Sequence, residues 1–468
     1  MSWTQGLPFK KGEQLELKVT DLALGGKGIA KVDDFTFFVE STLPGDLVKA
    51  QITRLKPNYA EAKSLEIISP SSFRVGPRCS HFGICGGCAW QNLDYPRQVE
   101  FKTKQVRETL EHIGGFSNPP VKPAIPSPEI FYYRNKMEFS FSADHDNLPV
   151  LGLHKKDRFD LVFNLDKCYL QSETSNLIVQ FIREFVKRNQ ISIYDLKTHQ
   201  GLLRFLTIRE GKNTAEIMIN IVTDKGDFPE GKILAQGLSE KFPQIKSVVR
   251  NINPHKAQIA VGEKEEVLAG ENFITEKIGD FIFEISANSF FQTNTKQAEK
   301  LYEVILGMAD LKGKETVLDL YSGTGTISFY LAQKSQKVVG VESNPKTVQD
   351  AKKNAELNKI SNCQFICEEA KTFLALALIR QEKFDLIVID PPRAGLHPQV
   401  VENILKLSPP EIIYVSCNPA TLARDLKFLC EEKYQIELVQ PLDMFPHTFH
   451  IESVAKLSKK GHEKAEPP

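Results

Sequence analysis

The chain has 468 residues, 41% of them apolar, and its 59 lysines and arginines are balanced by 59 aspartates and glutamates. This length and composition predict about three domains, each able to bury a core. The longest strongly apolar runs, such as residues 373–379, are far shorter than the roughly 20 residues of a membrane-spanning helix, which excludes a membrane protein and predicts a soluble cytoplasmic one.

Short apolar strands separated by glycine and Asn/Asp turns fill residues 1–70. The runs 16–20 and 35–39 are examples, with a Gly-Gly-Lys-Gly turn between them. Brief strands at regular spacing predict a small β-barrel of the oligonucleotide-binding size. The segment 43–46 (Leu-Pro-Gly-Asp) and the residues after it resemble the TRAM domain, an RNA-binding barrel.

A TRAM-like barrel implies contacts with RNA through cations and a stacking ring. The side chains that would supply them are Lys27, Lys31, Arg54, Lys56 and Tyr59. The alternative is a generic barrel with ordinary surface lysines.

Three of the eight cysteines, Cys79, Cys85 and Cys88, lie within ten residues, and Cys168 stands alone further along the chain. No signal-peptide pattern precedes them, so the clustering indicates metal ligation rather than disulfides. Zinc is the default ion for four sulfur ligands, and an iron–sulfur cluster is the rarer choice. A redox pair at Cys85 and Cys88 is a third interpretation, but it leaves Cys79 without a role.

Residues 71–285 carry mixed helix and strand signals and are expected to form a central α+β domain. Helical spacing over 98–112 stops before a Gly-Gly pair, and a proline-rich connector follows at 119–128. The segment 132–139 (Tyr-Tyr-Arg-Asn-Lys-Met-Glu-Phe) combines rings with cations, which suits a splayed-out RNA strand.

An apolar strand at 316–320 breaks into a glycine-containing turn and then a helical pattern, as in the opening of a doubly wound nucleotide-binding sheet. A second strand, 337–341, ends in Glu342, where a carboxylate can accept both hydroxyls of a ribose. The spacing also fits a dinucleotide cofactor. Against that, Ser328 stands where the dinucleotide fingerprint prefers Gly or Ala, and no second nucleotide-binding half follows.

Another apolar strand, 384–389, ends in Asp390-Pro391-Pro392. The prolines stop the strand and fix the loop, so Asp390 is expected at the same sheet edge as Glu342. An ordinary strand-terminating turn is the plain alternative. Methyltransferases that act on exocyclic amines place an aromatic residue after the prolines, whereas this chain has Arg393, which favours a different target atom.

A third strand, 412–416, ends at Cys417, where Asn-Pro forces the chain out of the sheet. Open α/β sheets hold their ligands at this edge, so the thiol is a candidate nucleophile. A buried cysteine that packs as a small apolar residue is the alternative.

Five segments between residues 290 and 454 resemble, in family order, the catalytic domain of the RNA uridine-5-methyltransferases. They are 290–294 (Phe-Phe-Gln-Thr-Asn), 319–326, 390–395 (Asp-Pro-Pro-Arg-Ala-Gly), 416–419 (Ser-Cys-Asn-Pro) and 447–452 (His-Thr-Phe-His-Ile-Glu). The resemblance implies a Rossmann-like domain over 286–456 with S-adenosylmethionine as methyl donor, Cys417 as nucleophile and Glu452 as base. The side chains implied to bind the donor are Gln292, Tyr321, Glu342 and Asp390.

These roles have a chemical logic. Carbon 5 of uracil is a poor nucleophile, but a thiolate that adds to carbon 6 turns it into part of an enolate that can attack a methyl group. A base then removes the extra proton and the thiol is eliminated. We therefore expect the surroundings of Cys417 to favour its thiolate.

The spacing Cys-x5-Cys-x2-Cys with a distant fourth cysteine resembles the four-iron, four-sulfur site of the ribosomal branch of this family. The resemblance therefore favours a 4Fe-4S cluster over zinc at Cys79, Cys85, Cys88 and Cys168. By the same analogy the expected substrate is 23S ribosomal RNA, with transfer RNA as the alternative. The chemistry above has no redox step, so the cluster is expected to be structural or to position RNA.

Other function classes stay open: a methyltransferase of an amine or of cytosine carbon 5, and a catalytically silent RNA-binding protein. A net charge of zero is unusual for an RNA partner, so positive side chains are expected to gather on one face. We expect a monomer without an obligate protein partner. The tail 457–468, rich in Lys, Glu and Pro, is expected to be disordered.

Overall fold

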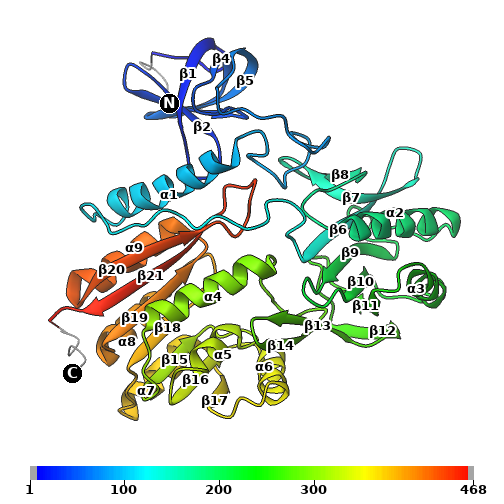
Figure 1. Ribbon diagram of the computed structural model, residues 1–468. Helices are drawn as coiled ribbons and strands as arrows, with labels where there is room; N and C mark the ends of the chain where they lie inside the picture. The colour runs from blue at the N-terminus through cyan, green and yellow to red at the C-terminus, as the bar shows by residue number, and fades with distance from the viewer. Residues whose placement is uncertain (1–7, 462–468) are drawn as a thin grey trace.

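The computed structural model describes residues 8–461 as a β-barrel, a central mixed sheet and a doubly wound sheet (Figure 1). This architecture confirms the expected fold class. Among the helices of the described residues, none combines the length and apolar character that a bilayer crossing requires.

The barrel closes five strands in the order β1-β2-β3-β5-β4, so no strand is left with an unpaired edge. Alternate side chains along β1 point inward, where Leu17 and Val19 pack against Phe37 and Val48. The strands are β1 (Gln14–Leu22), β2 (Gly28–Val32), β3 (Phe35–Glu40), β4 (Leu47–Leu55) and β5 (Tyr59–Ser69).

The central sheet has seven strands in the order β12-β11-β10-β9-β6-β7-β8, with α2 and α3 packed against it. Every residue of β9 and β10 is buried, because these strands lie in the middle of the sheet. The elements are β6 (Lys136–Ala143), β7 (Pro149–Lys155), β8 (Arg158–Asn164), α2 (Glu173–Arg188), β9 (Leu203–Glu210), β10 (Ile217–Thr223), α3 (Glu230–Lys241), β11 (Ile245–Ile252) and β12 (Lys264–Gly270).

The third unit is a seven-stranded sheet in the order β17-β16-β15-β18-β19-β21-β20, of which β15 to β19 are parallel. Successive side chains face opposite cores: Val317 packs on one side of the sheet and Leu318 on the other. The strands are β15 (Thr316–Leu320), β16 (Lys337–Glu342), β17 (Cys363–Cys367), β18 (Leu386–Ile389), β19 (Glu411–Ser416), β20 (Tyr434–Leu442) and β21 (Glu452–Lys459).

Helices cover both faces of this sheet and complete a three-layer sandwich. The core on one face includes side chains of α4, α5, α6 and the hairpin β13–β14, and the core on the other includes those of α7, α8 and α9. The elements are β13 (Phe273–Ile278), β14 (Phe281–Ser286), α4 (Thr295–Ala309), α5 (Thr326–Ala332), α6 (Pro345–Leu357), α7 (Ala370–Ile379), α8 (Pro398–Leu407) and α9 (Pro419–Glu432).

Helix α1 (Tyr95–His112) runs between the barrel and the seven-stranded sheet of the third unit, which the sequence predicts to carry the catalytic site and which is called the catalytic sheet below (Figure 1). It falls in the range expected for the central domain, yet its Val106 and Leu110 pack in the core of the catalytic sheet. The connector after it also joins that sheet, because Val121 pairs with Val439 of β20. An amphipathic pattern predicts a helix but does not say which sheet its apolar face covers.

Two elements, the hairpin β13–β14 and strand β21, lie at the expected boundaries near residues 285 and 456. The hairpin β13–β14 belongs to the catalytic core through Phe283 and Ile285. Strand β21 continues to Lys459, past the expected start of a disordered tail, because it pairs with β20 to its end. The remainder of that expected tail, 462–468, lies outside the described residues.

Candidate active site

The carboxyl edge of the parallel strands gathers the side chains expected to carry the chemistry. Tyr321, Asp390 and Cys417 each follow directly after a strand, and Glu342 is the last residue of β16. Glu452 opens the antiparallel strand β21, in which Ser453 pairs with Ser416 of β19. This register places Glu452 and Cys417 at the same edge of the sheet.

A pocket at this edge is lined by Gln292, Tyr321 and Asp390, three of the four side chains expected to bind the donor. Glu342 is not among its lining residues and lies half-buried at the end of the next strand, where its Oε1 accepts the N–H of Asn344 at 2.8 Å. Ser322, Gly323 and Thr324 of the glycine turn also line this pocket. Gly325 has φ +87°, and a Cβ there would lie 2.8 Å from the ring of Phe365.

Asp319, at the end of β15, is a residue whose role the sequence did not indicate. Its buried Oδ2 accepts a hydrogen bond from the Ser328 hydroxyl of α5 at 2.5 Å, and its Oδ1 has no hydrogen-bond partner within residues 8–461. Burial raises the pKa of Asp319 to about 7. Ser328, which departs from the dinucleotide fingerprint, therefore ties the helix after the glycine turn to the strand before it.

Cys417 opens onto a second cavity, of about 240 Å³, beside Arg393, Phe449 and His450. The barrel contributes to its wall through Leu24 and Gly25. The Cys417 thiol at the edge of the catalytic sheet thus faces a cavity lined by residues of that domain and of the barrel.

The Ser-Cys-Asn-Pro segment has a local structural reason. Asn418 caps α9 through its side chain, which accepts the N–H of Ala420 at 3.1 Å, and its Nδ2 donates to the Arg393 carbonyl at 3.1 Å. Pro419 takes the first helical position, where a missing N–H costs nothing. These contacts fix the turn that presents the thiol.

The thiol is not activated in the free protein, so the expectation that its surroundings favour the thiolate is wrong for this state. Burial raises the pKa of Cys417 to about 11, and the charge of Glu452 adds to the effect, while Arg393 acts in the opposite direction. Here the loss of hydration disfavours the Cys417 thiolate more than the nearby Arg393 cation favours it.

The two carboxyls at the edge behave in the same way. Burial, reinforced by the charge of Asp390, raises the pKa of Glu452 well above its usual range, and burial raises the pKa of Asp390 to about 7. His450 is neutral at neutral pH, because burial and the nearby Arg393 lower its pKa to about 4. The free site therefore holds its titratable side chains near their uncharged forms, with Arg393 as a facing cation.

Cys79, Cys85, Cys88 and Cys168 all line one cavity of about 460 Å³ at the edge of the central domain, and none forms a disulfide. Burial, with the charges of the neighbouring cysteines, raises the pKa of Cys85 to about 11 and that of Cys88 to about 12. Within residues 8–461, no set of three or more His, Cys, Asp or Glu side chains is arranged to hold a metal ion.

Comparison with known proteins places this geometry in a family. Residues 94–460 match the model of the tRNA (uracil-5-)-methyltransferases, and residues 8–65 match the TRAM domain. The chain belongs to the tRNA (uracil-5-)-methyltransferase family. It is thus an RNA methyltransferase that uses S-adenosylmethionine, as expected, and its partner is RNA.

Relatives of this methyltransferase cover almost its whole length. An uncharacterized RNA methyltransferase of Chlorobaculum tepidum is 42% identical over 96% of this chain and 97% of its own. One of Halalkalibacterium halodurans is 40% identical over 98% and 99%. Among solved structures, the Pyrococcus abyssi tRNA (uracil-54, C5)-methyltransferase in complex with S-adenosyl-L-homocysteine is 32% identical, with a TM-score of 0.77, over 94% of this chain and 99% of that one.

Part of the segment expected to contact RNA is buried and hydrogen-bonded to other parts of the methyltransferase. Tyr133 is buried and donates its hydroxyl to the Pro446 carbonyl at 3.1 Å. Asn135, also buried, donates to the Gln292 carbonyl at 2.8 Å, next to the donor pocket. Alternate residues of this segment face inward, which the mixture of rings and cations did not reveal.

An aromatic and cationic surface lies beside that segment. The guanidinium of the exposed Arg78 lies 4.6 Å from the ring centre of Tyr169 and 5.2 Å from that of Phe131. On the barrel, Lys27 is paired with Glu61 at 2.8 Å, and Arg54 contacts the same carboxylate at 3.2 Å. Two of the cations expected to meet phosphates are therefore partly neutralised by the barrel's own acid.

Proposed function

We propose that this methyltransferase modifies carbon 5 of a uridine in 23S ribosomal RNA, through a covalent bond from Cys417 to carbon 6 and proton removal by Glu452. The observation that carries the proposal is the shared sheet edge, with Cys417 in a cavity beside the pocket of Gln292, Tyr321 and Asp390. A flipped uracil in that cavity would meet the thiol on its ring and the donor pocket beyond it.

Each bond change has a side chain to serve it. After the Cys417 thiol has lost its proton to solvent, its sulfur bonds to carbon 6, and the electron pair of the carbon 5–carbon 6 double bond moves onto the uracil carbonyl as an enolate. Carbon 5 then takes the methyl group, the bond between that methyl group and the donor sulfur breaks, and S-adenosylhomocysteine leaves. Glu452 takes the hydrogen from carbon 5, the double bond forms again and the sulfur–carbon bond breaks, which restores Cys417.

The residues of the donor pocket fit the adenosyl donor. Gly323 of the glycine turn lines the pocket together with Tyr321 and Gln292, and a glycine there leaves the backbone open to a ligand. When bound, S-adenosylmethionine supplies an electrophilic methyl group with the positive charge of a sulfonium, and a nearby positive charge favours ionised carboxyls. Glu342, one strand away, is proposed to accept the ribose hydroxyls.

In the free site both Cys417 and Glu452 hold their protons, so each has to lose its proton before the step that it serves. With a pKa of about 11, Cys417 is a thiol until RNA arrives, and Arg393 is the cation that then faces the developing charge. Glu452 holds a proton in the free protein and can act as a base only after it has lost that proton.

A methyl-transfer assay tests the function. Uridine-containing ribosomal RNA is incubated with methyl-labelled S-adenosylmethionine, and incorporation is compared between the wild type, Cys417→Ala and a matched Cys430→Ala control. Cys417→Ala should abolish incorporation while Cys430→Ala retains it. Normal turnover by Cys417→Ala would contradict the proposed nucleophile.

The identity of the RNA has a specific second candidate. The cysteine spacing supports 23S ribosomal RNA, whereas the similar solved structure is of a transfer RNA (uracil-54, C5)-methyltransferase. Mapping 5-methyluridine in a strain that lacks the gene decides between them. Loss from 23S ribosomal RNA supports the first, and loss from transfer RNA replaces it with the second.

We infer that the four cysteines hold a 4Fe-4S cluster rather than one zinc ion. A single zinc needs four sulfurs about 2.3 Å from one point. The support for a cluster is the spacing of the four cysteines, which all line one cavity of about 460 Å³. The reaction needs no redox step, so the cluster would hold the segment 79–88 in place.

Metal and sulfide analysis of anaerobically purified protein tests this inference. Iron and acid-labile sulfide should be present together and should fall in Cys88→Ser but not in Cys367→Ser, which changes an exposed cysteine elsewhere. Zinc without sulfide would overturn it. We further infer that the enzyme is cytoplasmic and acts as a monomer. Sedimentation analysis of the purified protein checks the monomeric state.

A further inference from the structure

Residues 443–451 connect β20 to β21 and form a loop at the catalytic edge, called the 443–451 loop below. Three of its residues, Phe449, His450 and Ile451, line the cavity that contains Cys417. The loop leads directly into Glu452. The loop therefore forms a wall of the target cavity and leads into the proposed base, whose backbone is also paired with Leu442 at the end of β20.

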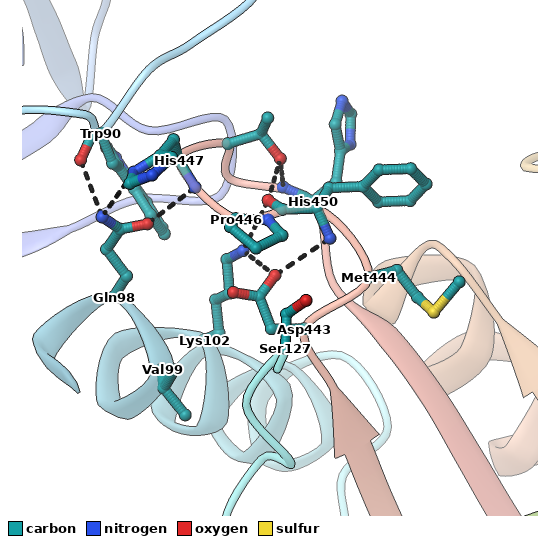
Figure 2. A network of polar contacts seen from close by, with 12 residues as sticks. Trp90, Gln98, Val99, Lys102, Ser127, Asp443, Met444, Pro446, His447 and His450 are labelled. Carbon is teal, nitrogen blue, oxygen red and sulfur yellow. Dashed lines mark hydrogen bonds and ion pairs between the residues drawn. The ribbon is translucent and has the colours of Figure 1, made fainter. Parts of the chain in front are cut away.

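A buried ion pair from helix α1 holds the start of this loop (Figure 2). Lys102 Nζ lies 2.5 Å from Asp443 Oδ1 and donates to the Phe445 carbonyl at 3.1 Å. The same Asp443 oxygen accepts the N–H of Phe445 at 3.1 Å. Both charged side chains are 0% exposed, so the Lys102 ammonium binds the turn 443–445 at a place that water does not reach.

Gln98, one helical turn before Lys102, holds the next part of the loop. Its Oε1 accepts the N–H of His447 at 2.8 Å, while its Nε2 donates to the Trp90 carbonyl at 3.0 Å (Figure 2). The His447 carbonyl in turn accepts the N–H groups of Ala89 and Trp90, each at 2.9 Å. One glutamine thus ties the loop to the segment that follows Cys88.

His447 has φ +67°, a left-handed conformation that a non-glycine residue adopts at a cost. Such a conformation persists only where surrounding contacts enforce it, and it often marks a functional site. Here the contacts are those of Gln98, Ala89 and Trp90 with the two backbone groups of His447.

A role in stability alone explains these contacts less well. A buried lysine loses its hydration, and replacing a buried ion pair by apolar side chains is often neutral or stabilising. What an apolar pair cannot do is bond the Phe445 carbonyl and fix one conformation of the turn. The ion pair is therefore better suited to specifying the loop than to strengthening the fold.

We propose that Lys102, supported by Gln98, is a positioning residue for Glu452 that acts by fixing the 443–451 loop. This inference rests on the proposed function. Lys102 donates to Asp443 and Phe445 of the loop, and the contact of the loop with α4 is made by Met444, whose carbonyl accepts from Asn294 Nδ2 at 3.1 Å. Loss of Lys102 should therefore slow removal of the carbon 5 proton more than addition of the thiol or transfer of the methyl group.

The experiment measures an intermediate rather than overall activity. If proton removal becomes slow, the methylated uracil stays bonded to Cys417, and a denaturation-resistant enzyme–RNA adduct carrying the methyl label accumulates with ordinary uridine RNA. Glu452→Gln is the reference for this outcome. Lys102→Met should accumulate the same adduct and slow its breakdown about 100-fold, the effect of an ångström-scale misplacement.

The matched control is Lys104→Met, on the same helix, where Lys104 pairs with Asp21 of the barrel at the surface. It should show wild-type adduct levels. Because Lys102→Met leaves Asp443 without its partner, the charge-balanced variant Lys102→Met/Asp443→Asn is measured beside it, together with melting temperature and binding of S-adenosylhomocysteine.

The outcomes separate this inference from the function on which it rests. Adduct accumulation in a folded Lys102 variant with normal S-adenosylhomocysteine binding supports it. Folded variants in which all steps slow equally, or no adduct forms although Glu452→Gln forms one, overturn it and leave the function intact. Failure of both variants to fold also overturns it, since Lys102 would then serve the fold alone. Active Cys417→Ala would instead refute the function.

Discussion

At the scale of single residues, burial controls the reactive groups of this methyltransferase. Cys417, Asp390 and Glu452 all have raised pKa values because they are withdrawn from water, and neighbouring carboxyl charges add to the increase at Cys417 and Glu452. Arg393 is the cation set against them, and it opposes the increase at Cys417 and Glu452. The free enzyme therefore protects its thiol from side reactions, and activation is expected to depend on the RNA.

This state predicts a steep pH dependence for the reaction of Cys417 with iodoacetamide. With a pKa of about 11, the thiolate fraction and hence the alkylation rate should increase about tenfold for each pH unit between 7 and 10. Peptide mapping by mass spectrometry follows residue 417 separately from the exposed Cys367. A rate that levels off below pH 9 would show a thiolate already stabilised in the free protein.

The raised pKa of Asp319 predicts a second pH effect. Its folded pKa of about 7 exceeds that of an unfolded aspartate, so its contribution to stability is present at low pH and is lost as the pH rises through about 7. Asp319→Asn stays neutral and keeps an acceptor for Ser328. The melting temperature of Asp319→Asn minus that of the wild type should therefore be larger at pH 8 than at pH 5. An equal difference at the two pH values would contradict this prediction.

At the scale of elements, the carboxyl edge of the parallel strands was predictable because each strand ended in a distinctive signal. A glycine turn, a proline pair and Asn-Pro marked the ends of β15, β18 and β19, respectively, and the structure places all three ends together. The partner of α1 was not predictable, because a helical stripe shows that a face is buried but not where. The same limit hid Lys102, which from sequence looks like a surface lysine.

The glycine turn after β15 gives a prediction at this scale. Gly325→Ala would force a side chain into a left-handed backbone and toward Phe365, at a cost of roughly 1–2 kcal/mol before any clash. Calorimetry should show weakened binding of S-adenosylhomocysteine and a lower melting temperature. The control is Gly307→Ala in α4, where a Cβ meets nothing within 4 Å and should stabilise the helix. Equal effects of the two substitutions would argue against a tight donor turn.

At the scale of the whole molecule, the barrel and the catalytic sheet meet around the target cavity. The barrel supplies Leu24 and Gly25, helix α1 holds the 443–451 loop, and the catalytic sheet supplies Cys417. The sequence indicated each unit, but not this meeting, because contacts across domains leave no periodic signal. The pairing of Lys27 with Glu61 inside the barrel was hidden because residues so far apart in the chain give no sequence signal of their contact.

The barrel wall predicts that a barrel substitution affects catalysis. Leu24→Asp places a negative charge in the target cavity from a side chain that is 47% exposed, so the fold should tolerate it. The KM for RNA should rise at least tenfold, about 1.4 kcal/mol, with unchanged binding of S-adenosylhomocysteine. Leu65→Asp, at an equally exposed barrel leucine outside the cavity, should behave as wild type. Similar KM values for both variants would mean that the barrel does not meet the target.

The central claim is the temporary bond between Cys417 and the uracil ring, and the most direct test is to capture it. RNA with 5-fluorouridine at the target position allows addition and methyl transfer but not elimination, because fluorine replaces the hydrogen that Glu452 removes. Mass spectrometry of the digested complex should find a methylated fluorouracil nucleotide on the peptide that contains Cys417. An active wild-type enzyme that forms no such adduct, or forms it on another residue, would contradict the account.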